Sequence, residues 1–293
     1  MSDTYTRARE FILTHARLLE RLLFAARFEG GDAAAVGRVV AAYQNGDGGL
    51  GHALEPDLRC SSSQPLFAEV GLSALRDAGR REPELARRLC DYLETVCDAR
   101  GLVPIIDAQA LCEPRASHWT AAGEPSLNPT AGICGLLHFQ QVEHGWLERA
   151  TQTCQSLLLA QPPQEGHTLL SAAQLCEHIP DPRAAGQLTE VVARALPQAT
   201  FYIPEAPVTE YGLTPLHFAR ASDSQFAPFF TATQLDGHLD ELAAQQQEDG
   251  GWPIHWEAPG PGATCEWRAR VTYEALRVLD GYGRLSREEW PAG

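Results

Sequence analysis

The stretch that decides the fold is Gln44-Asn45-Gly46-Asp47-Gly48-Gly49-Leu50, because a close copy returns as Gln246-Gln247-Glu248-Asp249-Gly250-Gly251-Trp252. In both copies Gly follows Gln four residues later, and a large apolar residue comes two positions after that Gly. Each copy ends one helical pattern and precedes another, and the following segments, 72–79 and 276–283, both read Leu-x-x-Leu-x-x-x-Gly. An internal repeat of this kind indicates an architecture built from repeated units.

The Asp-Gly-Gly core of each copy predicts a tight turn. Glycine adopts positive φ without strain, and Asp hydrogen-bonds its own backbone in such turns. The Gln side chain can cap backbone groups left open at the end of a helix. A weaker third copy runs from Cys97 to Val103, with Cys in the place of Gln.

This pattern resembles the QW repeat, Gln-x-x-x-Gly-x-Trp, of the squalene-hopene cyclase, terpene cyclase and protein prenyltransferase superfamily. Gln246, Gly250 and Trp252 match all three positions, and the first copy matches two, with Leu50 in place of the Trp. The resemblance implies an all-α fold, a single α/α toroid domain over residues 1–293 whose inner and outer helices alternate around a central cavity. In that superfamily the motif itself is structural.

Apolar periodicity predicts about eleven helices in five to six hairpins and no convincing strand. Ten of them are 3–28, 32–44, 64–79, 82–98, 129–142, 146–160, 167–179, 182–196, 232–247 and 266–283, and a further helix start is predicted at Pro215. Residues 102–127 and 197–215 contain several prolines and are expected to be irregular.

Composition bounds the class of protein. The chain has 293 residues, 44% of them hydrophobic, which is enough for a full core. Its net charge of −15 argues against nucleic acid and against an anionic membrane surface as partners. No apolar run reaches the roughly 18 residues that a membrane span needs.

Location follows from the N-terminus and the cysteines. The chain begins with a short polar stretch and an amphipathic helix, which is not the pattern of a signal peptide. The eight cysteines form no Cys-x-x-Cys pair, and we expect most to be buried thiols in a reducing cytoplasm.

In a toroid, the loops before the inner helices converge on one mouth of the cavity, and the corresponding loops here are rich in polar and aromatic residues. The substrate-binding candidates from these loops are His52, Arg59, Gln64, Asn128, Thr130, Thr214, Trp252, Trp256, Glu266, Trp267 and Arg268. Ser63 or Gln64, Asn128 and Thr214 are alternatively simple helix N-caps.

Glu55 and Asp57 are the candidates for a general acid. A carboxyl group beside an apolar cavity keeps its proton more readily, and a second carboxyl nearby strengthens the effect. Alternatively, either residue pairs with Arg59 or caps a turn. His167 opens a predicted helix, where the dipole disfavours the imidazolium, so His167 or Tyr211 is the candidate base or orienting group.

Aromatic side chains are concentrated near the end of the chain. Their faces could stabilise a cationic intermediate, as cyclases of the resembled superfamily do, or they could simply pack. These residues are Phe201, Tyr202, Tyr211, Trp252, Trp256 and Trp267.

No metal or cofactor is predicted. Cys134 and His138 lie one helical turn apart, but a third ligand is missing from the pattern. The chain lacks the Asp-x-Asp-Asp and Asp-Asp-x-x-Asp motifs of terpene cyclases and the Asp-x-Cys zinc set of the prenyltransferases. Gly48-Gly49 lacks the Lys and Ser/Thr of a phosphate-binding loop.

The leading hypothesis for function is cofactor-independent acid–base cyclisation or isomerisation of a small, apolar, isoprenoid-like substrate. A second is a sugar-active enzyme, such as a glycosidase, lyase or epimerase, since α/α toroids also house these and carboxylates with tryptophans suit carbohydrates. A third is a ligand-binding or interaction module without catalysis. The oligomeric state stays open.

Overall fold

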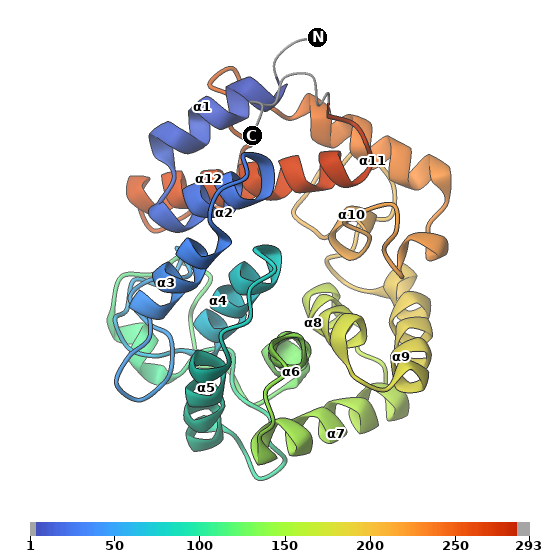
Figure 1. Ribbon diagram of the computed structural model, residues 1–293. Helices are drawn as coiled ribbons and strands as arrows, with labels where there is room; N and C mark the ends of the chain where they lie inside the picture. The colour runs from blue at the N-terminus through green and yellow to red at the C-terminus, as the bar shows by residue number, and fades with distance from the viewer. Residues whose placement is uncertain (1–3, 286–293) are drawn as a thin grey trace. The chain divides into compact units, whose positions relative to one another are not determined.

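The computed structural model describes residues 4–285, and this part of the chain is all α-helical, with isolated bridges but no strand. It contains twelve α-helices (Figure 1). They are α1 Thr4–His15, α2 Leu18–Phe28, α3 Ala33–Ala42, α4 Pro65–Asp77, α5 Pro83–Val96, α6 Leu127–Gln140, α7 Gly145–Ala160, α8 Gly166–His178, α9 Pro182–Ala195, α10 Pro215–Phe218, α11 Ala232–Ala244 and α12 Pro261–Gly281.

The helices form two compact units, Met1–Ala35 with Phe201–Gly293, and Val36–Thr200. The boundary falls within α3. A single toroid domain over 1–293 would require a particular arrangement of the two units, so it stays a prediction.

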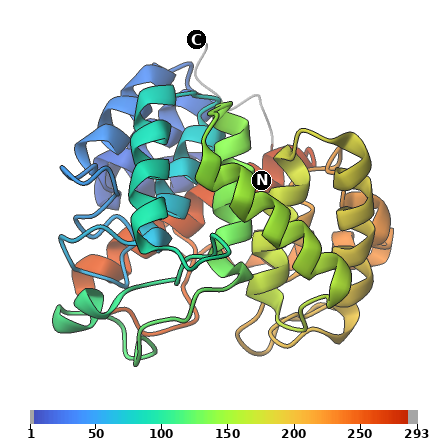
Figure 2. The ribbon, with the colours of Figure 1, turned by 90° about the horizontal axis from the view of Figure 1, so that it is seen from below.

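In the unit 36–200, α6 packs between α4 and α8 (Figure 1). The close approach of α6 and α8 requires glycine, because a Cβ on Gly135 would lie 2.2 Å from the carbonyl oxygen of Gln174. Helices α5, α7 and α9 pack against this group. Figure 2 shows the loops of residues 44–63 and 98–126 together at one end of α4 and α5, and backbone hydrogen bonds such as Ala116 N to Asp57 O join them.

The other unit joins the two ends of the described chain, because α1 and α2 pack on α12. Its core contains a cluster of aromatic rings. The ring centres of Tyr5 and Phe24 lie 5.7 Å apart, and those of Phe28 and Tyr273 lie 6.4 Å apart.

Most predicted helices begin and end near the expected residues, with two corrections. The long helix predicted over 3–28 is two helices, because Arg17 has an extended backbone (φ −62°, ψ 166°) and caps α2. The last helix begins at Pro261 rather than 266, with proline at its first position, where a missing N–H costs nothing. Within residues 4–285, no helix is long and apolar enough to cross a membrane.

Candidate functional site

The two copies of the repeated turn have the same backbone. Gly48 has φ +92° and Gly250 has φ +90°, a region that strains residues with a side chain. A Cβ on Gly48 would lie 2.3 Å from the carbonyl oxygen of Arg88, and a Cβ on Gly250 would lie 2.2 Å from that of Arg7. Each turn therefore requires glycine for two reasons: the backbone has a positive φ, and a neighbouring carbonyl oxygen leaves no room for a Cβ.

The Gln of each copy closes its turn and attaches it to a second helix. Gln44 Nε2 donates to the carbonyl of Gly48 at 2.8 Å and to that of Leu85, on α5, at 3.1 Å. Gln246 Nε2 donates to its own turn glycine and to Thr4 O, on α1, both at 2.9 Å. The Gln thus bonds its own turn and a carbonyl in the first turn of another helix, rather than capping the open groups at the end of the preceding helix as expected.

The weaker third copy is also confirmed, with a different donor. Gly101 has φ +90°, and Asp98 N donates to Leu102 O at 2.8 Å, as the matching groups do in the first two turns. The position of Gln is occupied by Cys97. Instead, Trp146 Nε1 on α7 donates to the carbonyl of Gly101 at 3.1 Å.

The first two turns differ in what holds their Asp. In the second copy, the guanidinium of Arg268 donates to both carboxylate oxygens of Asp249 and to Gln247 Oε1, each at 2.7 Å. The hydrogen bonds from Arg268 lower the pKa of Asp249. The guanidinium of Arg268 therefore lies between the side chains of Gln247 and Asp249.

In the first copy a hydroxyl takes that place. Ser63 Oγ donates to Asp47 Oδ1 at 2.8 Å and accepts from Asn45 Nδ2 at 3.0 Å. A hydroxyl is much smaller than a guanidinium, and an open pocket of about 510 Å³ lies beside these residues. In the second copy of the turn the guanidinium of Arg268 therefore covers the Asp, whereas in the first copy a pocket lies beside Asp47 and Ser63.

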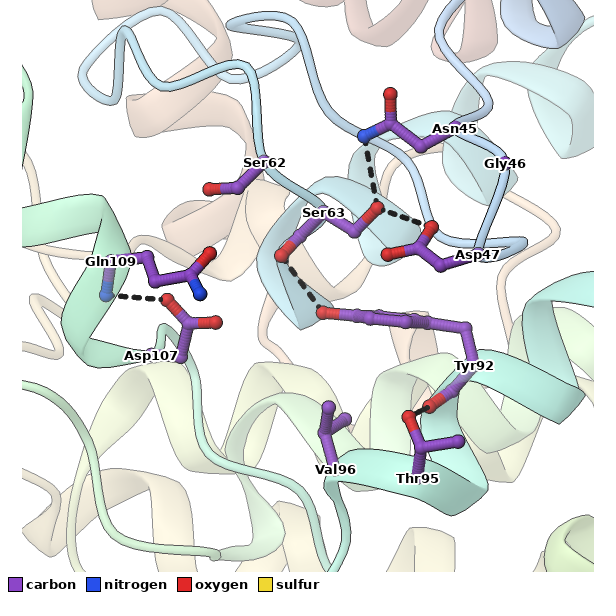
Figure 3. A pocket seen from close by; sticks show the side chains of 10 residues that line it. All are labelled: Asn45, Gly46, Asp47, Ser62, Ser63, Tyr92, Thr95, Val96, Asp107 and Gln109. Atoms are coloured by element: carbon purple, nitrogen blue, oxygen red, sulfur yellow. Dashed lines mark hydrogen bonds between the residues drawn. The ribbon is translucent and has the colours of Figure 1, made fainter.

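The pocket has polar and apolar surface in about equal share and carries two carboxylates (Figure 3). In the view of Figure 3, Asp107 and Gln109 lie opposite Asn45 and Asp47, with the ring of Tyr92 between them. Hydrogen bonds from Gly49 N and Ser63 reach Oδ1 of Asp47, those from Gln64 and Gln109 N reach Oδ1 of Asp107, and the second oxygen of each acid is turned toward the pocket. The lining residues are Asn45, Gly46, Asp47, Ser62, Ser63, Tyr92, Thr95, Val96, Asp107 and Gln109.

Tyr92, on α5, supplies a fixed phenol at the side of this pocket. Its hydroxyl donates to the carbonyl oxygen of Ser63 at 2.9 Å. Burial raises the pKa of Tyr92, and the negative charges of Asp107 and Asp47 raise it further. The phenol therefore keeps its proton near neutral pH.

Gln64 is a substrate-binding candidate that the structure places behind this pocket. It is fully buried and is the N-cap residue of α4, but its side chain makes no cap hydrogen bond. Its amide instead pairs with Asp107, with Nε2 donating to Oδ1 at 2.9 Å and Oε1 accepting from the backbone N–H at 2.8 Å. Gln64 thus positions a carboxylate of the pocket.

The proposed acids lie in a buried loop of the same unit. Glu55 and Asp57 are 5% and 3% exposed, and Glu55 Oε2 accepts from Leu58 N at 3.1 Å. Asp57 Oδ2 lies 3.8 Å from Nε2 of His118, a residue that the sequence did not single out. A second pocket, of about 400 Å³, borders the strand-like stretch that pairs with this loop and is lined by Arg115, Ala116, Ser117, Trp119 and Thr120.

Other candidates of this loop have structural contacts. His52 has φ +59° and is exposed. Arg59 Nη1 donates to Pro56 O at 3.4 Å. The alternative that Arg59 pairs with Glu55 or Asp57 stays open.

His167 lies at the start of α8 beside a carboxylate. Its Nδ1 is 2.6 Å from Glu165 Oε1, and the same carboxylate caps α8 by accepting from the backbone of His167 and Thr168 at 2.9 Å. Burial alone would raise the pKa of Glu165, but the hydrogen bonds from His167 and Thr168 outweigh it and lower the pKa to about 2. The expectation for His167 considered only the helix dipole and missed this anion.

The candidates at the start of α6 serve the backbone. Thr130 is buried, and its Oγ1 accepts from Val103 N at 2.9 Å and donates to Ser126 O at 2.6 Å. Asn128 is in a non-helical conformation within α6, and its carbonyl accepts from Ser126 Oγ at 2.7 Å.

In the unit 201–293 with 1–35, Trp252 is part of the scaffold. It is 2% exposed, its Nε1 donates to Leu242 O at 2.7 Å, and its backbone N–H donates to Thr272 Oγ1 at 2.9 Å. This geometry favours the packing alternative for Trp252.

The same unit brings four of the predicted aromatic residues together. The ring centres of Trp256 and Trp267 lie 5.0 Å apart at 87°, and Tyr211 lies 6.2 Å from Trp256. Phe201 lies 6.3 Å from Tyr211, and the guanidinium of Arg270 lies 5.2 Å from the Trp267 ring. Phe201 and Tyr211 are each about half exposed.

Of two further candidates in this unit, Thr214 lies at a helix start and Glu266 lies within α12. Thr214 is the N-cap residue of α10, and its backbone N–H donates to His217 Nδ1 at 2.9 Å. The carboxylate of Glu266 lies 3.7 Å from the guanidinium of Arg17.

The predicted site residues thus divide between the units. His52, Glu55, Asp57, Arg59, Gln64, Asn128, Thr130 and His167 belong to the unit 36–200, and Tyr211, Thr214, Trp252, Trp256, Glu266, Trp267 and Arg268 belong to the other. Their convergence on one mouth stays a prediction.

Among residues 4–285, no three His, Cys, Asp or Glu side chains are placed to hold a metal ion. Cys134 is buried, and Nε2 of His138 lies 3.0 Å from Thr151 Oγ1.

No protein-family model matches the chain, and no curated protein matches it in sequence.

Proposed function

We propose that this chain is an acid–base enzyme whose substrate is a small, hydroxylated, sugar-like molecule bound in the pocket beside the first repeated turn. The observation that carries the proposal is the lining of that pocket, which combines amide, hydroxyl and phenol groups with two carboxylates. Such a lining offers hydrogen bonds to hydroxyl groups beside an about equal share of apolar surface, a combination that suits the hydroxyl groups and the C–H faces of a sugar.

Asp107 is the proposed group that exchanges a proton with the substrate, and Asp47 is the carboxylate that holds the substrate beside it. Each carboxylate is oriented by hydrogen bonds to Oδ1, from Gly49 N and Ser63 at Asp47, and from Gln64 and Gln109 N at Asp107. The carboxylate of Asp107, held in this way, can take a proton from a substrate hydroxyl or return one, the work that carboxylates do in sugar-active enzymes.

The test is turnover of a panel of glycosides and free sugars by the wild-type protein and by Asp47→Asn and Asp107→Asn. We expect Asp107→Asn to lower turnover about 100-fold or more, because general acid–base groups contribute on that scale, and Asp47→Asn to lower it through weaker binding of the substrate. Glu84→Gln, at an exposed position on α5, is the matched control and should leave turnover unchanged. Full turnover by both pocket variants would overturn the proposal, and sugar binding without any conversion would identify a binding module instead.

A second candidate is the cyclisation or isomerisation of an isoprenoid-like substrate in an α/α toroid, carried out in the cytoplasm. Three copies of one turn support a toroid of the terpene cyclase and prenyltransferase type. The buried acids Glu55 and Asp57 and the perpendicular rings of Trp256 and Trp267 support the chemistry. Conversion of a polyprenyl substrate that survives in both Glu55→Gln and Asp57→Asn would exclude the proposed acid.

A further inference from the structure

We infer that the ligand of the pocket beside the first repeated turn carries a cationic nitrogen group, a guanidinium or a primary ammonium, which binds Asp47. The inference deepens the proposed function and rests on it only for the choice of pocket. If the substrate is sugar-like, it is therefore an amino sugar or a guanidinylated sugar rather than a neutral one.

The second copy of the turn is the template for this contact. There the guanidinium of Arg268 binds both oxygens of Asp249 and also Gln247 Oε1. This is the paired geometry in which guanidinium and carboxylate bind most strongly. The protein itself thus contains one copy of the turn with a guanidinium in place.

The first copy presents its carboxylate in the same way. Asp47 and Asp249 both accept a hydrogen bond from the N–H two residues later, at 2.9 and 3.1 Å, and the glycines between have φ +92° and +90°. The carboxylates therefore leave the two turns in matching directions. The two turns differ at the amide, because Gln247 accepts from Arg268 through Oε1, whereas Asn45 donates through Nδ2 to Ser63 Oγ, so the shared anchor for a cation is the carboxylate.

The hydroxyl of Ser63 satisfies only part of this arrangement. It reaches Oδ1 of Asp47, whereas Arg268 reaches both oxygens of Asp249. The second oxygen of Asp47 is turned toward the open pocket (Figure 3). A nitrogen donor from a ligand can take the position that Arg268 Nη1 takes in the second turn.

The charge of the pocket selects for a cation. The residues of the described chain that line it include Asp47 and Asp107 but no Lys, Arg or His. Both carboxylates act on the same phenol, since each raises the pKa of Tyr92. Two anions at close range attract a positive group and repel an anionic one.

An organic cation fits this site better than a metal ion. Within residues 4–285, no group of three His, Cys, Asp or Glu side chains is arranged to hold a metal. Calcium takes six or more oxygen ligands, whereas an ammonium or guanidinium is satisfied by two or three acceptors.

The experiment is a calorimetric titration of the full chain with glucose, glucosamine, methylguanidine and calcium chloride. We expect glucosamine to bind about tenfold or more tightly than glucose, the scale of one charge-assisted hydrogen bond, and methylguanidine to compete with it. Asp47→Asn should remove the preference for glucosamine. Asp249→Asn is the matched control, because its carboxylate already binds Arg268, and it should keep the preference.

A second variant guards against loss of folding. Ser63→Arg would supply the guanidinium from within the chain, and in a protein with an unchanged circular dichroism spectrum it should abolish methylguanidine binding. Equal binding of glucose and glucosamine would overturn the inference and leave the proposed function standing. Methylguanidine binding without binding of either sugar would support the inference and contradict the proposed function. Calcium binding in competition with glucosamine would overturn the inference, and so would the absence of binding by any probe.

Discussion

The hydroxyl of Ser63 lies 2.8 Å from Oδ1 of Asp47 and so occupies, with one oxygen atom, the place that a whole guanidinium occupies in the second turn. The backbone of the two turns is the same, and the difference lies in the side chain that comes to them from the next segment. The repeated sequence therefore sets the backbone conformation of the turn, and residues outside the repeat decide whether a pocket forms beside it.

Gly48→Ala should destabilise the unit 36–200 by about 1–3 kcal/mol, because the Cβ requires a strained positive φ and would lie 2.3 Å from the Arg88 carbonyl oxygen. Urea unfolding followed by circular dichroism measures the change. Gly46→Ala is the control, since no atom lies within 4 Å of its Cβ position and its φ is not positive. Equal midpoints for the two variants would contradict the role given to Gly48.

Gln44→Ala should cost about 1–3 kcal/mol, because it leaves the carbonyls of Gly48 and Leu85 without the amide donor that serves both. Chemical denaturation gives the free energy of unfolding. Gln152→Ala, an exposed position on α7, removes an amide of the same size and should change stability by less than about 0.5 kcal/mol. A loss as large for Gln152→Ala would show that the effect is not specific to the turn.

Trp146→Phe should also destabilise the protein, by about 1–3 kcal/mol, because the buried ring keeps most of its packing but loses the N–H that serves Gly101. The loss should be visible as faster amide hydrogen exchange at residues 98–102. If exchange there is unchanged while global stability falls, packing rather than the hydrogen bond explains the cost.

Glu165 should make stability depend on acid pH. Its pKa is lowered from 4.5 to about 2, so its contribution is complete above about pH 4.5 and is lost as the pH falls toward 2. The stability difference between wild type and Glu165→Gln should therefore shrink between about pH 5 and pH 2, measured by urea unfolding. The difference for Glu84→Gln, which is largely exposed, should stay nearly constant, and parallel curves for both variants would refute the assignment.

Helix positions could be predicted well because apolar spacing and the prolines that begin α4, α9 and α10 are local signals. The break at Arg17 could not, since apolar residues continue on both sides, and the extended Arg17 binds Glu266, which is distant in the sequence. The site was predicted in part. The sequence predicts Gln64 as a substrate-binding residue or a helix cap and Ser63 as a cap alone. It does not indicate Asp107, which lies in an irregular stretch and is positioned by Gln64, a contact between distant parts of the sequence.

The identity of the donor to each turn glycine also sets when that turn can close during folding. For Gly48 and Gly250 the donor is a Gln only four residues away, so the ring can form within a local segment. For Gly101 the donor is Trp146, on a helix that must first be made and docked. Contacts between distant residues form more slowly than local ones. The third turn should thus be the last of the three to become rigid, although its final conformation is the same.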